Sequence, residues 1–234
     1  MKIDYYDKKK MSATTFKRFL QCPAAAYHEP VIDSEAMRIG SEVDNRLLGG
    51  VETPFLTPKT GKPSAKEFQI QEMVEKARSN DRFMASLEGE YQKEFEFQIE
   101  GIEWKSKLDV YNKDKRFITD LKTTRTLAEQ YNKKTKMFER PWILWDYDIQ
   151  MAVYAFATGI DKVFLSFIAK DNLDLSIIEV PAEVLKAALY EKILPNNKKV
   201  AEQYYEGKDL WRCGKCSYCI QTRTEEELIG DWWE

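Results

Sequence analysis

The sequence of 234 residues has one histidine, four cysteines and no long apolar stretch. Its longest apolar run, Met151–Ala157, is far shorter than the roughly 20 residues of a membrane-spanning helix, so we expect no transmembrane segment. The first ten residues lack the apolar core of a secretion signal, which predicts a cytoplasmic protein with reduced thiols. Because His28 is the only histidine, sites built from histidine clusters are excluded, and carboxylate, lysine and cysteine chemistry remains.

Neither sign of charge dominates the chain. Lys and Arg total 36 against 39 Asp and Glu, which gives a net charge of −3 and argues against a general polyanion-binding surface. The distribution is uneven, because residues 105–140 hold 11 basic and 5 acidic side chains. This stretch could face phosphate groups, and a solvated surface is the alternative.

Apolar content is sufficient for a folded core. Hydrophobic residues make up 43% and aromatic residues 13% of the chain, a composition that excludes wholesale disorder. No composition shift, repeat or linker divides the sequence, so we expect residues 1–234 to form one domain.

Helix signals dominate the first third of the chain. Ser12 predicts the start of a helix that Pro23 stops or redirects. Ser34 predicts a second helix, which Gly49 ends, and a capping box at Ser64 predicts a third, which runs to about Ala77. The second helix is expected to carry one stripe of side chains: Met37, Gly40, Asp44 and Leu47.

The middle of the chain changes to strand periodicity. Apolar and polar side chains alternate over residues 94–100 and 104–111, and a third strand is expected over 116–122. Turn residues separate these segments, which predicts a three-stranded antiparallel meander.

The remaining elements complete an α+β fold with one mixed sheet. Asp146 or Asp148 can cap a helix that Gly159 closes. Its expected apolar stripe consists of Ile149, Ala152, Val153 and Phe156. The elements expected after it are strands over 162–169 and 173–180 and a long helix over 181–206.

Acidic and basic side chains concentrate on two of the predicted strands. Asp120 and Lys122, two residues apart on one strand, point to the same face. Asp109 lies on the preceding strand, among Lys105 and Lys107, and a hairpin can make it a neighbour of Asp120. Two close carboxylates repel unless a cation lies between them, and Mg²⁺ suits oxygen ligands. Plain surface ion pairs are the alternative.

The helix before Gly159 carries a polar strip. Gln150 and Tyr154 lie one turn apart and off the apolar stripe. Polar side chains on a buried helix need partners, so this pair either reaches a polar site or satisfies backbone groups of the core.

Four motifs, in this order along the chain, are similar to those of RecB-like nucleases of the PD-(D/E)XK superfamily. They are Gly40 to Asp44, Asp109, the strand Ile118–Thr124 (ITDLKTT), and Gln150 to Tyr154. Ten residues separate Asp109 from Asp120-Leu121-Lys122, which resembles the core spacing of the superfamily. The resemblance implies an α/β/α restriction-endonuclease-like core within the α+β class.

The resemblance also implies roles for individual side chains. The ions held would be one or two Mg²⁺ or Mn²⁺, with Asp44, Asp109, Asp120 and the Leu121 carbonyl as ligands. Lys122 would orient a water or offset charge in the transition state. Asp44 departs from the family pattern, which has His or Glu there, so Glu42 is a substitute ligand. The residues implied for catalysis are Asp44, Asp109, Asp120, Lys122, Gln150 and Tyr154.

The cysteines form a pattern of their own. Cys213, Cys216 and Cys219 are separated by two residues each, a spacing typical of metal or cluster ligands, and Cys22 lies near the N-terminus. One cysteine before the core and three after it resemble iron–sulfur nucleases of the AddB family and of CRISPR adaptation, which implies a 4Fe-4S cluster joining both ends of the chain. The short last spacing leaves a four-thiolate Zn²⁺ site open, and a metal-free set with Cys22 buried is the third alternative.

The order of motifs over residues 12–223 most resembles the phage and prophage RecE-type exonucleases. This resemblance implies a Mg²⁺-dependent enzyme that degrades linear double-stranded DNA from 5′ to 3′ and leaves 3′ tails for a recombinase or single-strand annealing protein. A homo-oligomeric ring is an implied assembly. The alternatives are an iron–sulfur nuclease that trims DNA ends in CRISPR adaptation or repair, and an inactive DNA-end-binding module.

Three features remain outside these motifs. His28 is expected to cap or pack after the first helix. Residues 131–145 are expected to form a loop that carries Lys133, Lys134, Lys136 and Arg140 toward DNA. The acidic tail over 225–234 either docks a partner such as an annealing protein or is a solvated terminus.

Overall fold

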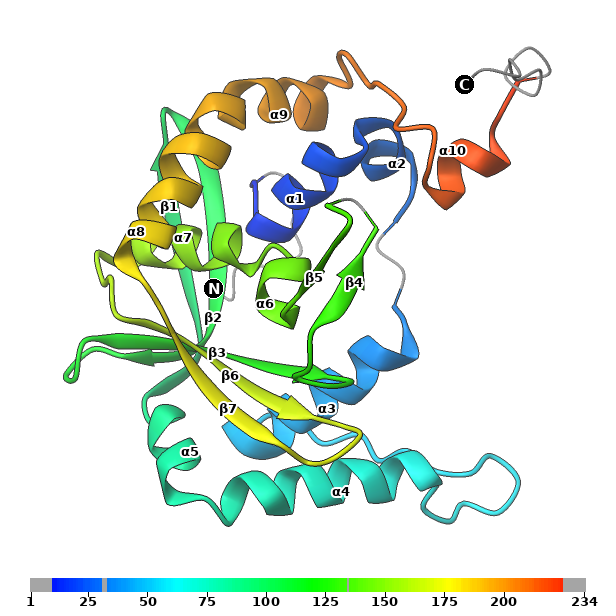
Figure 1. Ribbon diagram of the computed structural model, residues 1–234, viewed down its shortest axis with the longest axis vertical. Coiled ribbons are helices and arrows are strands. Elements are labelled where there is room, and N and C mark those ends of the chain that lie inside the picture. The colour runs from blue at the N-terminus through cyan, green and yellow to red at the C-terminus, as the bar shows by residue number, and fades with distance from the viewer. Residues whose placement is uncertain (1–9, 31–32, 134, 225–234) are drawn as a thin grey trace.

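The computed structural model describes residues 10–30, 33–133 and 135–224 (Figure 1). The expectations for the first nine residues, Lys134 and the acidic tail lie outside these ranges. Within the ranges, no helix combines the length and the apolar character needed to cross a bilayer.

A five-stranded mixed sheet forms the centre of the fold (Figure 1). All neighbouring strands are antiparallel except one parallel pair, the third and fourth in spatial order. The alternating pattern therefore predicted both the meander and the mixed sheet correctly. In spatial order the strands are β1 (Glu90–Ile99), β2 (Ile102–Asn112), β3 (Phe117–Thr124), β6 (Val163–Ala169) and β7 (Leu175–Val180).

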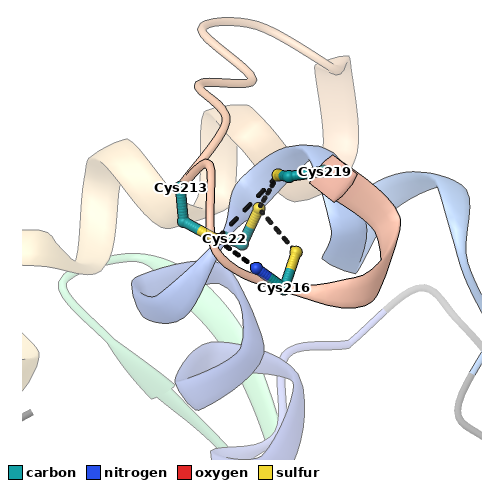
Figure 2. Close-up of side chains that lie close together, drawn as sticks. All are labelled: Cys22, Cys213, Cys216 and Cys219. Carbon is teal, nitrogen blue, oxygen red and sulfur yellow. Dashed lines mark hydrogen bonds between the residues drawn. The ribbon is translucent and has the colours of Figure 1, made fainter. Parts of the chain in front are cut away.

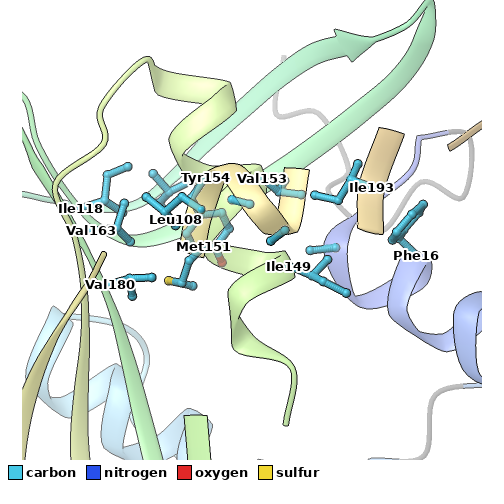
Figure 3. Packing of buried hydrophobic residues seen from close by; sticks show 14 of the residues in the cluster. Phe16, Leu108, Ile118, Ile149, Met151, Val153, Tyr154, Val163, Val180 and Ile193 are labelled. Carbon is cyan, nitrogen blue, oxygen red and sulfur yellow. The ribbon is translucent and has the colours of Figure 1, made fainter. Parts of the chain in front are cut away.

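Helices cover both faces of this sheet, which gives the expected α/β/α layering. On one face, α1 (Ala13–Gln21) and α7 (Tyr147–Thr158) share an apolar core with the strands, and Figure 3 shows Met151 of α7 among sheet residues. On the other face, Leu121 of β3 packs in a second core. The helices of that face are α3 (Glu35–Leu48), α4 (Ala65–Arg78) and α5 (Asp81–Ser86).

Capping residues begin and end the helices as the sequence predicts. The Ser12 side chain accepts a hydrogen bond from the first turn of α1. Cys22 is extended, and Pro23 starts the short helix α2 (Pro23–His28). Gly49 and Gly159 adopt left-handed conformations, with φ of 78° and 67°, at the ends of α3 and α7.

Two residues of the expected helix stripes are exposed instead. Met37 is 50% exposed, because the buried side of α3 runs through Ile39 and Val43, about one residue away from the predicted stripe. Phe156 is 42% exposed near the end of α7, where the centre of its ring lies 5.9 Å from that of the partly buried Phe97.

The long helix expected over 181–206 contains a π-helical segment. It consists of α8 (Ala182–Ala187), η1 (Ala188–Ile193) and α9 (Leu194–Glu206). Pro195 has no N–H to donate to the carbonyl of Glu191, and a wider turn accommodates its ring.

The segment 131–145 is not the expected loop. Strands β4 (Gln130–Asn132) and β5 (Met137–Glu139) form an antiparallel hairpin, and α6 (Pro141–Leu144) follows it. A buried polar contact stabilises the hairpin, since the Asn132 amide donates to Glu139 at 2.6 Å. Strands of three residues are too short for alternation to identify them.

Candidate active site

Strands β2 and β3 part at Asp109. Their antiparallel ladder covers three residue pairs and ends at Val110 and Thr119. At the next position the Asp109 carboxylate replaces a backbone partner, and its Oδ2 accepts a hydrogen bond from the Leu121 N–H at 3.0 Å. The Gln92 amide of β1 donates to Oδ1 at 3.3 Å. The carboxylate of Asp109 therefore lies in the gap between the two strands.

Asp120 is fully buried in β3 and is held from α7. The Gln150 amide donates to Asp120 Oδ1 at 3.1 Å, and the Tyr154 hydroxyl lies 3.4 Å from the same oxygen. The other oxygen, Oδ2, pairs with the Lys122 ammonium at 2.5 Å and accepts no hydrogen bond of favourable geometry within the described ranges. A buried carboxylate oxygen with so few partners can accept a further ligand.

The polar strip of α7 crosses this gap. The Gln150 amide donates to the Tyr154 hydroxyl at 2.7 Å, and the hydroxyl donates to the Lys107 carbonyl at 3.0 Å. Both outcomes expected for the strip therefore occur together, since it reaches the carboxylate of Asp120 and a backbone carbonyl of β2. The strip holds the two separated strands at a fixed position relative to α7.

Helix α3 brings a third carboxylate to the gap. Gly40 allows α3 to lie close to β3, because a Cβ at this position would lie 3.1 Å from Thr123 Oγ1. One turn later, Asp44 is half-buried in the cleft between α3 and the strands. The substitute ligand Glu42 does not lie in this cleft, because it is buried and accepts a hydrogen bond from Arg46 Nε at 2.8 Å.

Burial and mutual repulsion disfavour the ionised forms of Asp109 and Asp44 in this gap. Burial and then the charge of Asp120 raise the pKa of Asp109 to about 7, although Lys122 and a backbone N–H act against this shift. Burial and then the charge of Asp109 raise the pKa of Asp44 well above its ordinary value. Burial alone would lower the pKa of Lys122, but the charges of Asp120 and Asp109 outweigh it and raise the pKa, so the ammonium stays protonated.

The donor set fits a hard divalent cation. The three carboxylates repel one another, and each candidate side-chain ligand is an oxygen atom, as Mg²⁺ and Mn²⁺ prefer. The Leu121 carbonyl stays a predicted ligand. The side chains open into a cleft of about 380 Å³ lined by Ser12, Ala13, Thr14, Ser41, Asp44, Gln92, Lys105, Ser106, Lys107, Asp109, Asp120, Lys122, Gln150 and Tyr154.

Sequence reasoning missed three residues at or beside the cleft. Gln92 reaches Asp109 from β1. The ammonium groups of Lys17 and Lys122 lie 5.3 and 5.4 Å from the centre of the Tyr147 ring. These contacts join α1, α7 and β3, which are far apart in the sequence, so no local pattern could have indicated them.

The four cysteines come together at a second place, between the start of α2 and the short helix α10 (Ser217–Gln221) (Figure 2). All four sulfurs lie within 4.8 Å of one another, with 3.6 Å between Cys22 and Cys219 and 3.9 Å between Cys213 and Cys219. A Zn²⁺ ion bound tetrahedrally at about 2.3 Å from each sulfur places the sulfurs about 3.8 Å apart. In a 4Fe-4S cluster each sulfur binds a different iron, which requires wider separations. The observed distances therefore fit a single ion.

The surroundings of this cysteine cluster favour a thiolate. The N–H groups of Lys215 and Cys216 lie 3.5 and 3.4 Å from Cys213 Sγ, and against the effect of burial they lower the pKa of Cys213 to about 6. Nearby, His28 is exposed at the end of α2 and its ring stacks on Tyr218 at 5.8 Å. His28 thus packs after the first helix, as expected.

Comparison with known proteins adds a family and a fold. The family described as "PDDEXK-like domain of unknown function (DUF3799)" matches residues 12–222. A solved protein from Eubacterium rectale, proposed to be an exonuclease, has 24% identity and a TM-score of 0.84 over 96% of this chain and 94% of that chain, so the two share a fold. A phage-related exonuclease from Haemophilus somnus 129PT has 14% identity and a TM-score of 0.39 over 85% and 94%, which is too low to support an argument. No curated protein matches the sequence.

Proposed function

This chain belongs to the family of PDDEXK-like domains named DUF3799, and we propose that it is a metal-dependent deoxyribonuclease acting as an exonuclease. The observation that carries the proposal is the convergence of Asp44, Asp109, Asp120 and Lys122 where β2 and β3 part. Three carboxylates and an ammonium are the groups that metal-assisted hydrolysis of a phosphodiester requires.

Each side chain has a distinct task in the proposed reaction. When bound, the metal supplies Lewis acidity and a water of lowered pKa. Lys122 is protonated, so it donates hydrogen bonds that orient the attacking water or offset charge on the phosphate, and it does not act as a base. Gln150 and Tyr154 hold Asp120 Oδ1, so Oδ2, which pairs with Lys122, is the oxygen that would hold a metal ion. The proposed ligands of one or two Mg²⁺ or Mn²⁺ ions are Asp44, Asp109, Asp120 and the Leu121 carbonyl.

The proposed substrate is linear double-stranded DNA. Degradation runs from 5′ to 3′ and leaves 3′ single-stranded tails for a recombinase or single-strand annealing protein. The order of the four motifs, which resembles that of RecE-type exonucleases, supports this assignment, as does the exonuclease description of the Eubacterium rectale protein. A homo-oligomeric ring is part of the proposal, and light scattering of the purified protein tests it.

A labelled-duplex assay tests the enzyme. With Mg²⁺, a 5′ label should be released early, whereas a 3′-labelled strand should shorten progressively. Asp120→Asn and Lys122→Ala should each lower the rate about a hundredfold or more, because each removes a charge that acts at the reacting phosphate. Lys199→Ala, which removes an exposed lysine on α9, is the matched control and should keep the wild-type rate.

The outcomes of this assay separate the candidates. Early release of the 3′ label would overturn the RecE-type polarity and favour the second candidate, an iron–sulfur nuclease that trims DNA ends in CRISPR adaptation or repair. DNA binding without hydrolysis in Mg²⁺ or Mn²⁺ would leave an end-binding module.

We also propose that the four cysteines hold one structural Zn²⁺ ion. The sulfur separations of 3.6 and 3.9 Å support a single ion over the 4Fe-4S cluster that the cysteine order implies. Protein purified without oxygen should contain about one zinc per chain and no absorption band of thiolate-bound iron. Iron and labile sulfide in equal amounts would overturn the zinc assignment.

A further inference from the structure

The hairpin of β4 and β5 presents an aromatic pair to solvent. Tyr131 and Phe138 are register partners, so both lie on the same face of the hairpin, and their ring centres are 5.6 Å apart. Their exposed fractions are 50% and 67%, although rings of this size are usually covered. The pair therefore offers a ready surface for another flat ring.

The hairpin has a fixed orientation. Its opposite face holds the buried residues Asn132 and Glu139, whose side chains meet at 2.6 Å, and the Thr135 hydroxyl donates to the other Glu139 oxygen at 2.6 Å. The Arg140 guanidinium donates to the Leu127 carbonyl at 3.1 Å and ties the base of the hairpin to the preceding segment. An aromatic surface held in this way loses little entropy when it binds a ligand.

The hairpin follows β3 in the chain after a short connection, and its strand β4 contacts α6. Figure 1 shows it next to α6, beyond the end of β3. Trp142 of α6 lies 5.9 Å from the ring of Phe167, and Phe167 is the register partner of Lys122 on β3. A DNA strand that occupies the cleft could therefore extend onto the hairpin.

Charge around the aromatic pair matches a nucleic acid strand. Lys133 and Lys136 flank the turn, are exposed, and have no ion pair within the described ranges. The acidic side chain of the hairpin, Glu139, points inward and is hydrogen-bonded. Aromatic rings bind unpaired bases by stacking, while lysines bind the phosphates between them.

We propose that Tyr131 and Phe138 form a stacking surface for unpaired bases of a DNA strand that continues from the cleft, with Lys133 and Lys136 binding its backbone. The identity of this strand as substrate or product rests on the proposed nuclease function. The binding itself does not, because it requires neither metal nor hydrolysis.

Fluorescence anisotropy in EDTA tests the proposal. Wild-type protein is titrated into a labelled single-stranded oligonucleotide and into the matching blunt duplex. The double variant Tyr131→Ala/Phe138→Ala should bind the single strand about tenfold or more weakly and change duplex affinity less, because stacking needs unpaired bases. Lys133→Ala/Lys136→Ala should weaken both and flatten their salt dependence.

Matched controls isolate the ring faces. Tyr131→Phe keeps the ring and should retain wild-type affinity, and Phe68→Ala removes an equally exposed ring on α4 and should change nothing. A single-stranded oligonucleotide carrying 5-bromouracil, irradiated with the wild-type protein, should crosslink to the peptide that contains residues 130–139. This second measurement needs no variant and therefore holds even if the double variant misfolds.

Either experiment can overturn the proposal. Unchanged single-strand affinity of the folded double variant would do so, as would crosslinks that avoid the hairpin. A double variant that loses only self-association would assign the aromatic pair to an interface between copies of the chain. Loss of hydrolysis in Lys122→Ala is scored separately, so the stacking surface and the nuclease assignment can fail independently.

Discussion

Ionisation of the Asp109 carboxylate in the cleft destabilises the folded state. Asp109 lies where β2 and β3 part, and its pKa is about 7 because of burial and the neighbouring Asp120. Between about pH 4 and pH 7 this carboxyl group therefore holds a proton in the folded protein more often than in the unfolded chain. In the absence of metal, this group makes the free energy of unfolding fall as the pH rises through that interval.

Replacing Asp109 by Asn should stabilise the metal-free protein. Asn keeps an oxygen for the Leu121 N–H and removes the negative charge, so in EDTA at pH 8 the free energy of unfolding should rise by about 1–3 kcal/mol. At pH 4 the two proteins should be nearly equal, since the wild-type carboxyl is then protonated. Urea unfolding at both pH values measures the difference, and a pH-independent difference would contradict the electrostatic explanation.

Metal should reverse this order of stability. Mg²⁺ or Mn²⁺ binds the folded cleft of the wild type, so saturating metal should raise its Tm by about 3–8 °C over the value in EDTA. Asp109→Asn should respond much less, because a proposed ligand charge is lost. Thermal unfolding of both proteins in saturating metal and in EDTA measures this shift in Tm. An equal shift in both proteins would exclude Asp109 as a ligand.

At the level of secondary-structure elements, two buried glutamates and one arginine join α3, the following loop and α4. Arg46 pairs with Glu42 at 2.8 Å and with Glu67 at 2.9 Å, and each glutamate also accepts a loop N–H, from Thr53 and Phe55. Ser64 caps α4 as predicted, but the Glu67 carboxylate serves Arg46 and the loop instead of closing the capping box. The triad therefore fixes the helix that carries Asp44.

Replacing Arg46 by Met should destabilise the protein by about 3–5 kcal/mol, because it leaves two buried glutamates without their cation. Arg38→Met on the same helix is the matched control. Its ion pair with Asp33 is long, at 3.9 Å, and exposed, so the change should stay below about 0.5 kcal/mol. Urea unfolding measures both variants, and equal effects would contradict the role of the triad.

The elements that the sequence predicts well are those whose signals are local. The caps Ser12, Ser34, Gly49 and Gly159 set helix ends through their own backbone or the next turn. Strand alternation on β2 and β3 was enough to bring Asp109 and Asp120 together, because the hairpin register follows from a short turn.

Other features depend on distant contacts or on short segments. The helix α5 has six residues, and the β4–β5 hairpin has strands of three residues and a polar anchor, so neither gives a periodic signal. The contacts of Gln92, Lys17 and Tyr147 near the site arise only when β1, α1 and α7 meet, which no window of sequence contains. The alternation of β2 and β3 likewise does not indicate that the two strands part at Asp109.

Across the whole molecule, the cysteine cluster connects both ends of the described chain to the cleft. Cys22 directly follows α1, and the start of α1 lines the cleft through Ser12 and Thr14. Cys219 lies on α10, and the Arg212 guanidinium donates to its carbonyl at 2.9 Å. A metal ion at this cluster would therefore fix the C-terminal end of α1, while the N-terminal end of the same helix lines the cleft.

Cys219→Ser should loosen this connection. Cys219 is the most buried of the four cysteines, and its loss should release the proposed zinc, lower the Tm by about 5–10 °C and expose residues 207–216 to protease. Ser217 is exposed and lies two residues before Cys219, so Ser217→Ala is the control and should behave as wild type. A folded, protease-resistant Cys219→Ser protein of unchanged Tm would contradict a structural metal.

The parting of β2 and β3 also has a consequence for laboratory evolution. A library of this chain selected only for survival at high temperature in a chelating buffer should enrich neutral residues at positions 44 and 109, since these relieve repulsion that no metal ion offsets. Selection for heat resistance should therefore include Mg²⁺ and a turnover screen in every round, so that robust but inert descendants do not take over the population.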